Sequence, residues 1–256
     1  MARLVQRFSE PPHECPYLPD RSASLDVRIL IDVTPAELGH LLERGWRRFG
    51  PTYFRPSCAT CAECVSLRIP VAAYEPSRSQ RRARRQAAGL VRRVAPPAVD
   101  DERLALYARW HAQREARRGW EPSALDADRY AQDFAFPHPS VREVSFRDPA
   151  HGDRLVGLGI VDEVPGALSA AYFFWDPAAA PPSLGTAHIL LLVEEAAQRG
   201  LLYVYLGYRV EGCASLAYKA RFRPHELLDG RPGDRAATIW RPAGGTGEGR
   251  APASGS

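Results

Sequence analysis

Lysine is almost absent from this sequence of 256 residues. Lys219 is the only one, so nearly all of the 34 residues that are Lys or Arg are arginine. Such a bias reflects overall composition, and arginine richness by itself is therefore weak evidence for a nucleic-acid partner. A single lysine in an arginine-rich chain instead indicates a position that favours a compact ammonium over a planar, forked guanidinium.

Long apolar runs are also lacking. The longest aliphatic run, Ile189 to Val193, is too short to cross a bilayer, and the N-terminal stretch has no apolar segment of secretory-signal length. We therefore expect a cytoplasmic protein with no membrane partner, whose five cysteines stay reduced unless they bind a metal. Hydrophobic residues at 45% and charged residues at 25%, with a net charge of +4, are typical of a soluble globular protein.

One stretch near the C-terminus combines the lysine with several phenols. It runs from Tyr203 to Pro224 and reads YVYLGYRVEGCASLAYKARFRP. Residues 201–206 have the apolar character of a short strand, and the spacing of Leu216, Tyr218 and Lys219 favours a helix after it. Tyrosines on a half-buried strand are often packing residues, so the stretch indicates either a cleft lining or ordinary core.

The first half of the chain reads as a series of short elements. Residues 1–14 look irregular, and residues 27–33 (VRILIDV) favour a strand. A second strand over residues 65–74 contains a proline, which favours a sheet edge or a bulge. Between the two strands lies a helix start with a capping box, formed by Thr34, Pro35 and Glu37.

The second half alternates helices and strands. Two helices come first, one from Asp100 to about Arg118 and one after a cap at Ser123. They are followed by strands over residues 141–146, 155–164 and 167–175, a helix over 186–199, and strands over 201–206, 227–228 and 236–240. The strands before and after Pro165-Gly166 read as a hairpin, and the strand–helix–strand unit after it is a parallel step. This order predicts an α+β fold. It resembles the GNAT, or acetyltransferase-like, fold, in which two splayed strands form an acyl-donor cleft.

Two changes in composition divide the chain. We predict a smaller cysteine-containing N-terminal domain over residues 1–95 and a GNAT-like catalytic domain over residues 96–242, with Pro96 and Pro97 at the crossing. Residues 243–256 consist largely of Gly, Ala, Pro, Ser and Thr, so we expect this tail to be disordered.

Several separate motifs together resemble one family. They are CPYLPDR at 15–21, GWRRFG at 45–50, the cysteine run at 58–64, SRSQRRARR at 77–85, SLGT at 183–186 and the stretch at 203–224. The chain resembles the aminoacyl-tRNA–protein transferases, and its length resembles the bacterial aspartate/glutamate leucyltransferase branch. The resemblance implies transfer of leucine from leucyl-tRNA to the α-amine of proteins beginning with Asp or Glu, which creates an N-terminal degradation signal. It implies no required cofactor and no DNA partner.

Acyl transfer from a tRNA ester to an amine needs little base strength, because a free α-amine has a pKa of about 7.7–8.0. It needs alignment of the amine with the ester and stabilisation of the developing oxyanion and leaving oxygen. Lys219 and Tyr218 are the catalytic candidates. Successive helical residues point about 100° apart, so only one of the two should face the cleft. The alternative is a surface lysine beside a core tyrosine.

Recognition of an acidic first residue calls for a cation, best an arginine that binds the carboxylate through two donors. The substrate-binding candidates comprise four arginines, three tyrosines and the start of the helix after residue 182, whose backbone N–H groups suit a phosphate or terminal ribose. They are Arg47, Arg48, Arg209, Arg221, Tyr172, Tyr205, Tyr208, Ser183, Gly185 and Thr186. Solvated charge and core packing are the alternatives for individual members.

The densest charge in the chain lies within residues 77–93. Its arginines are candidates to follow the tRNA backbone, in which case binding would depend steeply on salt. These candidates are Arg78, Arg81, Arg82, Arg84 and Arg85. A solvated helix face is the alternative interpretation.

The cysteines form a possible four-thiolate set for zinc or an iron–sulfur cluster. Its members are Cys15, Cys58, Cys61 and Cys64. Buried reduced thiols are the alternative, and Cys213 is predicted to be a packing residue. His111 and His188 fall within helical patterns, so we expect both to be structural rather than catalytic.

Three rival functions stay open. An arginyl-tRNA–protein transferase would act on the same acceptors, and no residue of the sequence decides between leucine and arginine. A CoA-dependent N-acetyltransferase would share the fold, but its pyrophosphate loop is glycine-rich, whereas PPSLGTA at 181–187 has one glycine. A metal-stabilised RNA-binding module would account for the cysteines and arginines but leaves the stretch around Lys219 unexplained.

Overall fold

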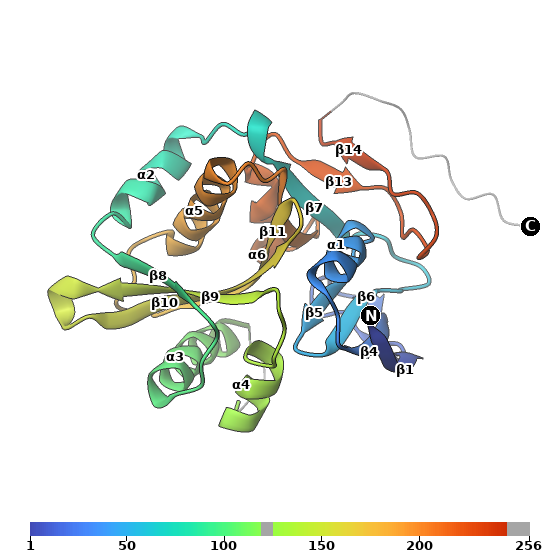
Figure 1. Cartoon of the computed structure of the whole chain (residues 1–256), viewed down its shortest axis with the longest axis horizontal. Helices are drawn as coiled ribbons and strands as arrows, with labels where there is room; N and C mark the ends of the chain where they lie inside the picture. The colour runs from blue at the N-terminus through green and yellow to red at the C-terminus, as the bar shows by residue number, and fades with distance from the viewer. Residues whose placement is uncertain (119–124, 245–256) are drawn as a thin grey trace, which may run out of the picture.

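The computed structural model of the chain describes residues 1–118 and 125–244 (Figure 1). In this part of the chain the strands form a four-stranded, an eight-stranded and a two-stranded sheet. The fold is thus a mixed α/β fold with one large sheet. Residues 245–256 of the tail expected to be disordered, and the expected helix cap Ser123, lie outside the described residues.

The four-stranded sheet is built from the N-terminal residues and has the order β1-β4-β6-β5. Its strands are β1 (Arg3–Ser9), β4 (Leu25–Ile31), β6 (Thr52–Pro56) and β5 (Arg47–Phe49). Helix α1 (Pro35–Glu43) begins at the predicted capping box on Thr34, which is confirmed. The helix buries Leu38, Leu41 and Leu42 against Trp46 and Tyr53.

The irregular structure expected for residues 1–14 is wrong. Strand β1 pairs antiparallel with β4, and the short β2 (His13–Glu14) pairs with β3 (Ser22–Ala23). Every residue of β1 is exposed, so no alternation of buried and exposed residues marks it in the sequence. Backbone pairing to its neighbour defines this edge strand.

The eight-stranded sheet has the order β14-β13-β7-β12-β11-β10-β9-β8. Its elements are β7 (Val65–Pro70), β8 (Val91–Ala95), β9 (Val141–Asp148), β10 (Arg154–Val164), β11 (Ala167–Trp175), β12 (Tyr203–Arg209), β13 (Glu226–Leu228) and β14 (Trp240–Pro242). The predicted hairpin is confirmed as β10–β11, and the parallel step as β11–β12. Strands β7 and β8 precede residue 96, so both halves of the chain contribute to this sheet. The domain division at residue 95 stays a prediction.

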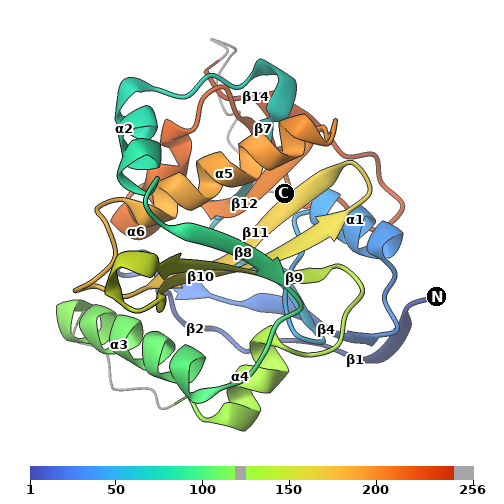
Figure 2. The same ribbon diagram turned by 60° about the vertical axis from the view of Figure 1, so that its left-hand side comes forward.

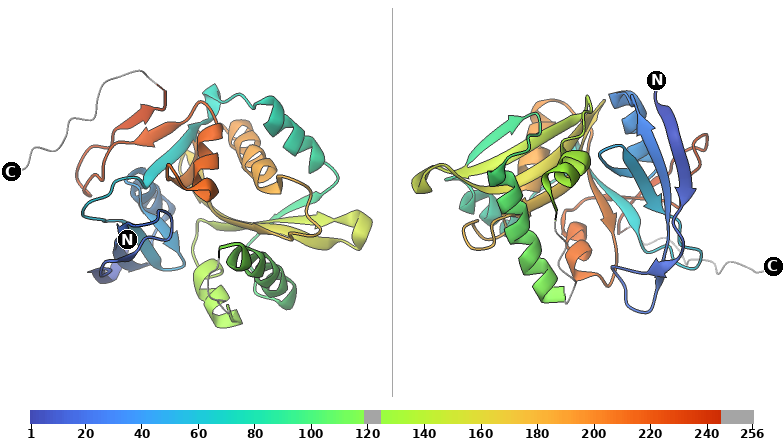
Figure 3. Two further views of the ribbon diagram at one scale, coloured as in Figure 1. Left: turned by 180° about the vertical axis from the view of Figure 1, so that it is seen from behind. Right: turned by 90° about the horizontal axis from the view of Figure 1, so that it is seen from below.

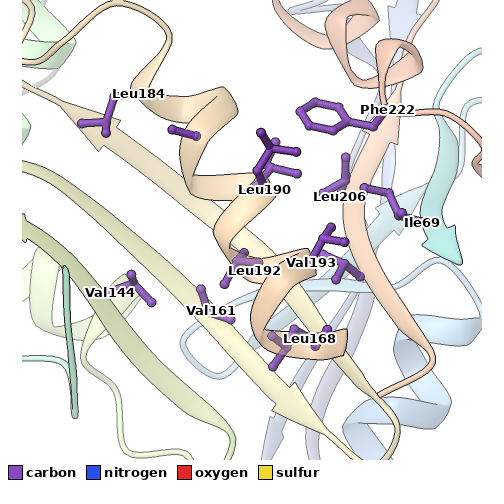
Figure 4. Packing of buried hydrophobic residues seen from close by; sticks show 14 of the residues in the cluster. Ile69, Val144, Val161, Leu168, Leu184, Leu190, Leu192, Val193, Leu206 and Phe222 are labelled. Atoms are coloured by element: carbon purple, nitrogen blue, oxygen red, sulfur yellow. The ribbon is translucent and has the colours of Figure 1, made fainter. Parts of the chain in front are cut away.

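Helices cover both faces of the large sheet (Figure 2). On one face α5 (Leu184–Gln198) packs with α2 (Arg78–Gln86), and on the other lie α3 (Asp101–Arg118) and α4 (Ala127–Phe134). Figure 4 shows Leu190, Leu192 and Val193 of α5 pointing toward β-strand residues such as Leu168 and Leu206. Burial of these side chains stabilises the fold by about 1.5–3 kcal/mol each.

The chain after β12 differs from the prediction. A single helix was expected, but residues 214–217 form one turn, α6 (Ala214–Ala217), which continues into the 3-10 helix η3 (Tyr218–Arg221). In the view from below, α6 lies between α3 and the N-terminal sheet (Figure 3). A short 3-10 turn, η1 (Val71–Ala73), follows β7, and another, η2 (Pro149–His151), lies between β9 and β10. Helix α4 is capped by Asp126.

Strands β11 and β12 separate partway along their length. Their parallel pairing spans Ala167 to Ser169 on β11 and Tyr203 to Tyr205 on β12. Beyond that point β11 continues to Trp175 and β12 to Arg209 without pairing to each other. On the far side β12 pairs with β7. The strand ends on either side of this divergence carry the candidate site.

Candidate active site

Two cations from distant parts of the chain meet at one glycine of β12. Gly207 has φ +81°, and a Cβ added there would lie 3.3 Å from the Lys219 Nζ and 3.6 Å from the Arg47 Nε. The absence of a side chain therefore leaves the space that both cations approach. A glycine within an apolar strand is the signal that indicates such a close approach.

Lys219 points inward from η3. Its Nζ donates a 2.9 Å hydrogen bond to the backbone oxygen of Tyr208. Burial, together with the nearby Arg47, lowers the pKa of Lys219 to about 7. The group therefore exchanges protons near neutrality, unlike an exposed lysine. The neighbouring Tyr218 is 37% exposed and packs against the Phe222 ring at a centroid distance of 6.5 Å.

Arg47 is 8% exposed and extends from β5 to the point where β11 and β12 diverge. Its Nη1 donates a 3.2 Å hydrogen bond to the Ser169 hydroxyl. Its Nε and Nη2 are buried and have no hydrogen-bond partner among residues 1–118 and 125–244. The guanidinium carbon lies 5.8 Å from the Tyr205 ring centroid and 5.9 Å from that of Tyr208. Two adjacent unpaired donors on one guanidinium are the arrangement that binds a carboxylate bidentately.

The other three candidate arginines have different surroundings. Arg48 is buried, pairs with Asp162 and donates to the Gly50 backbone oxygen. Arg209 pairs with Glu211 at 3.0 Å. Arg221 is exposed at the end of η3, where its backbone oxygen accepts a 3.1 Å hydrogen bond from the Gln80 side chain. Of the four, Arg47 has the geometry that best suits recognition of an acidic side chain.

The candidate tyrosines differ in what their hydroxyls contact. Tyr208 donates to the Gly45 backbone oxygen at 2.7 Å, which ties β12 to the N-terminal sheet. The Tyr205 hydroxyl accepts a 3.5 Å hydrogen bond from Arg68. Burial raises the pKa of both phenols, so both are protonated at neutral pH. The Tyr172 hydroxyl lies 3.1 Å from His111 Nε2.

Helix α5 begins just after β11 and the following loop. Ser183 is its N-cap residue, with φ +62° and no side-chain capping hydrogen bond. The Thr186 backbone nitrogen donates to the Ser183 oxygen at 2.9 Å. A Cβ on Gly185 would contact the ring of Phe173 at 3.6 Å. Residues 183–186 thus lie at the start of the helix, as expected, and their role in ligand binding stays a prediction.

The predicted arginine-rich segment forms α2, whose capping box is built by Ser77 and Gln80. Gln80 and Ala83 are buried, while most of the arginines face solvent. Arg84 is half-buried and pairs with Glu194 of α5 at 3.2 Å. The exposed members are Arg78, Arg81, Arg82 and Arg85. Helix α2 therefore presents a row of unburied guanidinium groups.

The cysteines near the N-terminus are all unbonded thiols. Burial, together with the nearby Cys58, Cys15 and Cys61, raises the pKa of Cys64 to about 12. The other three thiols are therefore close enough to Cys64 to affect it. Within the described ranges, no group of three or more His, Cys, Asp and Glu side chains has the arrangement of a metal site. Cys213 is buried, as its predicted packing role requires.

Two cavities in the described part of the chain have none of the residues of this site in their lining. One of about 490 Å³ is lined by Leu30, Asp32, Gly50, Phe136 and His138 among others. None of the helices in the described part of the chain is long and apolar enough to cross a membrane.

Ser169 and Gly207 were missed at the sequence level. Ser169 is one small polar residue in an apolar strand, which gives no signal by itself. Gly207 interrupts a run of apolar strand residues, and that interruption was the available clue.

The comparisons with known proteins agree along the chain. Residues 102–229 match the family model described as the C terminus of arginine-tRNA-protein transferase, and residues 13–82 match the model of its N terminus. An aspartate/glutamate leucyltransferase of Halorhodospira halophila is 38% identical over 221 residues, which cover 86% of this chain and 92% of the relative. One from Helicobacter hepaticus is 32% identical over 240 residues, covering 93% and 98%.

Solved structures give a weaker likeness. FemX aligns with a TM-score of 0.45 and 10% identity, covering 71% of this chain and 63% of FemX. The C-terminal domain of a putative lysylphosphatidylglycerol synthetase from Agrobacterium fabrum aligns with a TM-score of 0.46 and 14% identity, covering 80% and 62%. The two family models and the full-length relatives are sufficient, and the chain belongs to the arginine-tRNA-protein transferase family.

Proposed function

We propose that the protein transfers leucine from leucyl-tRNA to the α-amine of proteins that begin with Asp or Glu, which marks them for degradation. The full-length relatives that carry the name aspartate/glutamate leucyltransferase support the reaction. The observation that carries the proposal for this chain is Arg47, whose Nε and Nη2 are buried without a partner in the described residues. An unpaired buried donor is costly, and an acceptor carboxylate would satisfy both atoms.

In this proposal the acceptor is held by its first side chain. The carboxylate of Asp or Glu binds the Arg47 guanidinium, and the adjacent α-amine then lies near Gly207 and Lys219. The neutral amine attacks the ester carbonyl carbon of leucyl-tRNA, the new N–C bond forms as the nitrogen loses one proton that passes to solvent, and the bond to the ribose oxygen breaks. The Lys219 ammonium supports the negative charge and gives a proton to the leaving oxygen. Tyr218, the second catalytic candidate, packs against Phe222 and is given no step in this proposal.

The finer fold assignment and the tRNA contact are part of the same proposal. We infer a GNAT-like catalytic region because β11 and β12 diverge after Ser169 and Tyr205, with α5 between them in the chain. The tRNA backbone follows the exposed arginines of α2, and its terminal nucleotide approaches the start of α5. We also propose a cytoplasmic location, because the reaction uses charged tRNA.

A zinc ion or iron–sulfur cluster on Cys15, Cys58, Cys61 and Cys64 is a separate proposal. Four thiols are a donor set that suits either group, but these side chains must rearrange to reach a metal-binding geometry. No step of the transfer involves the metal. Elemental analysis of native protein tests this proposal, and Cys61→Ser should destabilise the N-terminal half if a metal is bound.

The function is tested by offering purified protein several donors and acceptors. Leucyl-tRNA, arginyl-tRNA and acetyl-CoA are each mixed with peptides that begin with Asp, Glu, Asn, Lys or Arg. We expect leucine on the Asp and Glu peptides alone. Arginine on the same peptides would establish the arginyl-transferase alternative, and acetylation would establish the CoA-dependent one. Binding of tRNA without turnover of any donor would favour the RNA-binding module.

A further inference from the structure

Three polar side chains form a continuous line from α3 to β11. The Tyr172 hydroxyl lies 3.1 Å from Nε2 of His111, and Nδ1 of the same ring lies 3.7 Å from Oε1 of Glu115. Glu115 is buried and follows His111 by one helical turn. We call this set the Glu115–His111–Tyr172 relay. A carboxylate beside Nδ1 favours the tautomer whose Nε2 accepts a proton.

The strand and its neighbours hold Tyr172 in place. The pairing of β11 with β10 shifts register between Ala170 and Tyr172, so Ala171 is an extra residue on β11. Such a bulge re-aims the side chains next to it. The Tyr172 ring is held edge-on by Phe49 at a centroid distance of 5.6 Å and by Trp110 at 5.8 Å.

The relay ends beside the candidate active site. Tyr172 follows Ser169, the partner of Arg47, by three residues on the same strand. Phe49, which packs on the Tyr172 ring, lies on the same short strand as Arg47. Tyr172 therefore stands beyond the point where β11 and β12 diverge, on the β11 side, while Lys219 lies on the β12 side.

We propose that the Tyr172 hydroxyl contacts the acceptor amine, takes a proton from it and passes its own hydroxyl proton to His111. Glu115 is a positioning residue for the imidazole. This proposal rests on the proposed function. This assigns a role in proton transfer to His111, which the sequence pattern alone indicated to be structural. Lys219 then serves the leaving oxygen at the opposite side of the reacting ester. The two groups divide the two proton transfers that aminolysis requires.

The protons balance in this scheme. As the N–C bond forms, the amine gives a proton to the Tyr172 oxygen, and the Tyr172 hydroxyl proton moves to Nε2 of His111. The C–O bond of the ester breaks, and the ribose oxygen takes a proton from Lys219. His111 is left as an imidazolium and returns its proton to solvent, to which its side chain is 18% exposed. Lys219 is left as a neutral amine and takes a proton from solvent, which restores both groups.

The surroundings of His111 suit this cycle. Burial lowers its pKa, and Arg114 opposes protonation while Glu115 favours it, so the resting ring is neutral at pH 7. Tyr107 stacks on the imidazole with a centroid distance of 3.9 Å, and its hydroxyl interacts with that of Tyr172. Burial raises the pKa of Tyr172, so the hydroxyl carries its proton until the reaction.

The first experiment compares Tyr172→Phe with Tyr130→Phe, which keep both rings and each remove one hydroxyl. We expect kcat for leucine transfer to fall about 100-fold in Tyr172→Phe, with an unchanged KM for leucyl-tRNA. The buried Tyr130 hydroxyl has no hydrogen-bond partner within the described residues, so Tyr130→Phe should keep a rate within a few-fold of the wild type. Wild-type rates in Tyr172→Phe would overturn the relay while leaving the proposed function intact, whereas a wild-type protein that transfers no leucine would overturn the function itself.

The second experiment separates proton transfer from structure. His111→Ala should lose about as much rate as Tyr172→Phe, and added imidazole should restore at least a tenth of it. The rate of leucine transfer should fall less in Glu115→Gln, because glutamine keeps the side-chain shape and a hydrogen-bonding group. Circular dichroism and melting temperature report folding in each variant. A folded His111→Ala protein that imidazole does not accelerate would overturn the proposal.

Discussion

Lys219 and Arg47 approach the same α-carbon, because a Cβ on Gly207 would lie 3.3 Å from the Lys219 Nζ and 3.6 Å from the Arg47 Nε. Gly207→Ala should therefore displace both cations and strain a backbone that has φ +81°. We expect kcat/KM to fall at least ~10-fold and stability to fall by about 1–2 kcal/mol. Peptide-transfer kinetics and urea unfolding measure the two effects.

Gly200→Ala is the matched control for this substitution. Gly200 has φ +66°, and nothing lies within 4 Å of a Cβ added there. Gly200→Ala therefore introduces the same kind of backbone strain as Gly207→Ala but displaces no neighbouring side chain. Equal loss of activity in the two variants would show that strain, and not the displaced cations, explains the result.

Arg47→Lys should weaken acceptor binding while the protein stays folded. A lysine keeps a positive charge but cannot offer two parallel donors to one carboxylate. We expect KM for an Asp-initiated peptide to rise about 10- to 100-fold, which corresponds to a charged hydrogen bond of about 1.5–3 kcal/mol. The Asn-initiated peptide, which we expect to be a poor acceptor, should change little.

Arg209→Gln is the control for Arg47→Lys. Arg209 pairs with the exposed Glu211 near the end of β12, so its loss should leave the acceptor preference unchanged. If Arg47→Lys retains the wild-type preference for Asp over Asn peptides, another group recognises the carboxylate.

Most of the elements around the site could be predicted from local patterns. The capping box at Thr34, the β10–β11 hairpin and the parallel step through α5 follow from turn residues and periodicity, and all three are confirmed. The exposed edge strand β1 could not be predicted, because it is stabilised by pairing with a partner and has no apolar face of its own.

The candidate site was predictable in its residue types and not in its geometry. Lys219 and Arg47 could be singled out because one is the only lysine and the other is an arginine of the GWRRFG motif at 45–50. Their meeting at Gly207 depends on how β5 is placed against β12, which is a long-range contact. The pairing of Arg48 with Asp162, which distinguishes it from its neighbour, is equally non-local.

The exposed arginines of α2 should determine how tRNA binding depends on salt. Replacing Arg78, Arg81, Arg82 and Arg85 by Gln removes charges that face solvent on one helix. We expect weaker binding of leucyl-tRNA and a salt slope reduced by somewhat less than about one unit per lost phosphate contact. Filter binding at several salt concentrations measures both quantities.

Arg3→Gln with Arg7→Gln controls for net charge. Both arginines are exposed on β1, in the other sheet, where they pair with Asp32 and Asp26. The control should lower the affinity for tRNA only slightly and leave the salt slope unchanged. Equal effects in the two sets of variants would mean that overall charge, and not α2, attracts the tRNA.

The pH dependence of transfer should report the protonation of Lys219. Its pKa is lowered to about 7 by burial and by Arg47, so the ammonium predominates below that pH and the neutral amine above it. If the ammonium protonates the leaving oxygen, its contribution is complete well below pH 7 and declines as the pH rises through 7. The acceptor amine, with a pKa of about 7.7–8.0, has the opposite effect, because its neutral fraction and hence the rate increase as the pH rises.

Dividing kcat/KM by the neutral fraction of the acceptor peptide isolates the contribution of Lys219 above pH 6.5, where the His111 ring is neutral because burial lowers its pKa. We expect the corrected rate to decline with an apparent pKa near 7 in the wild type. In Lys219→Ala that decline should be absent and the rate lower by about 100- to 10,000-fold, while tRNA affinity stays near normal. A corrected rate that instead rises through pH 7 would make the neutral amine of Lys219 the active form, and it would then act as a base.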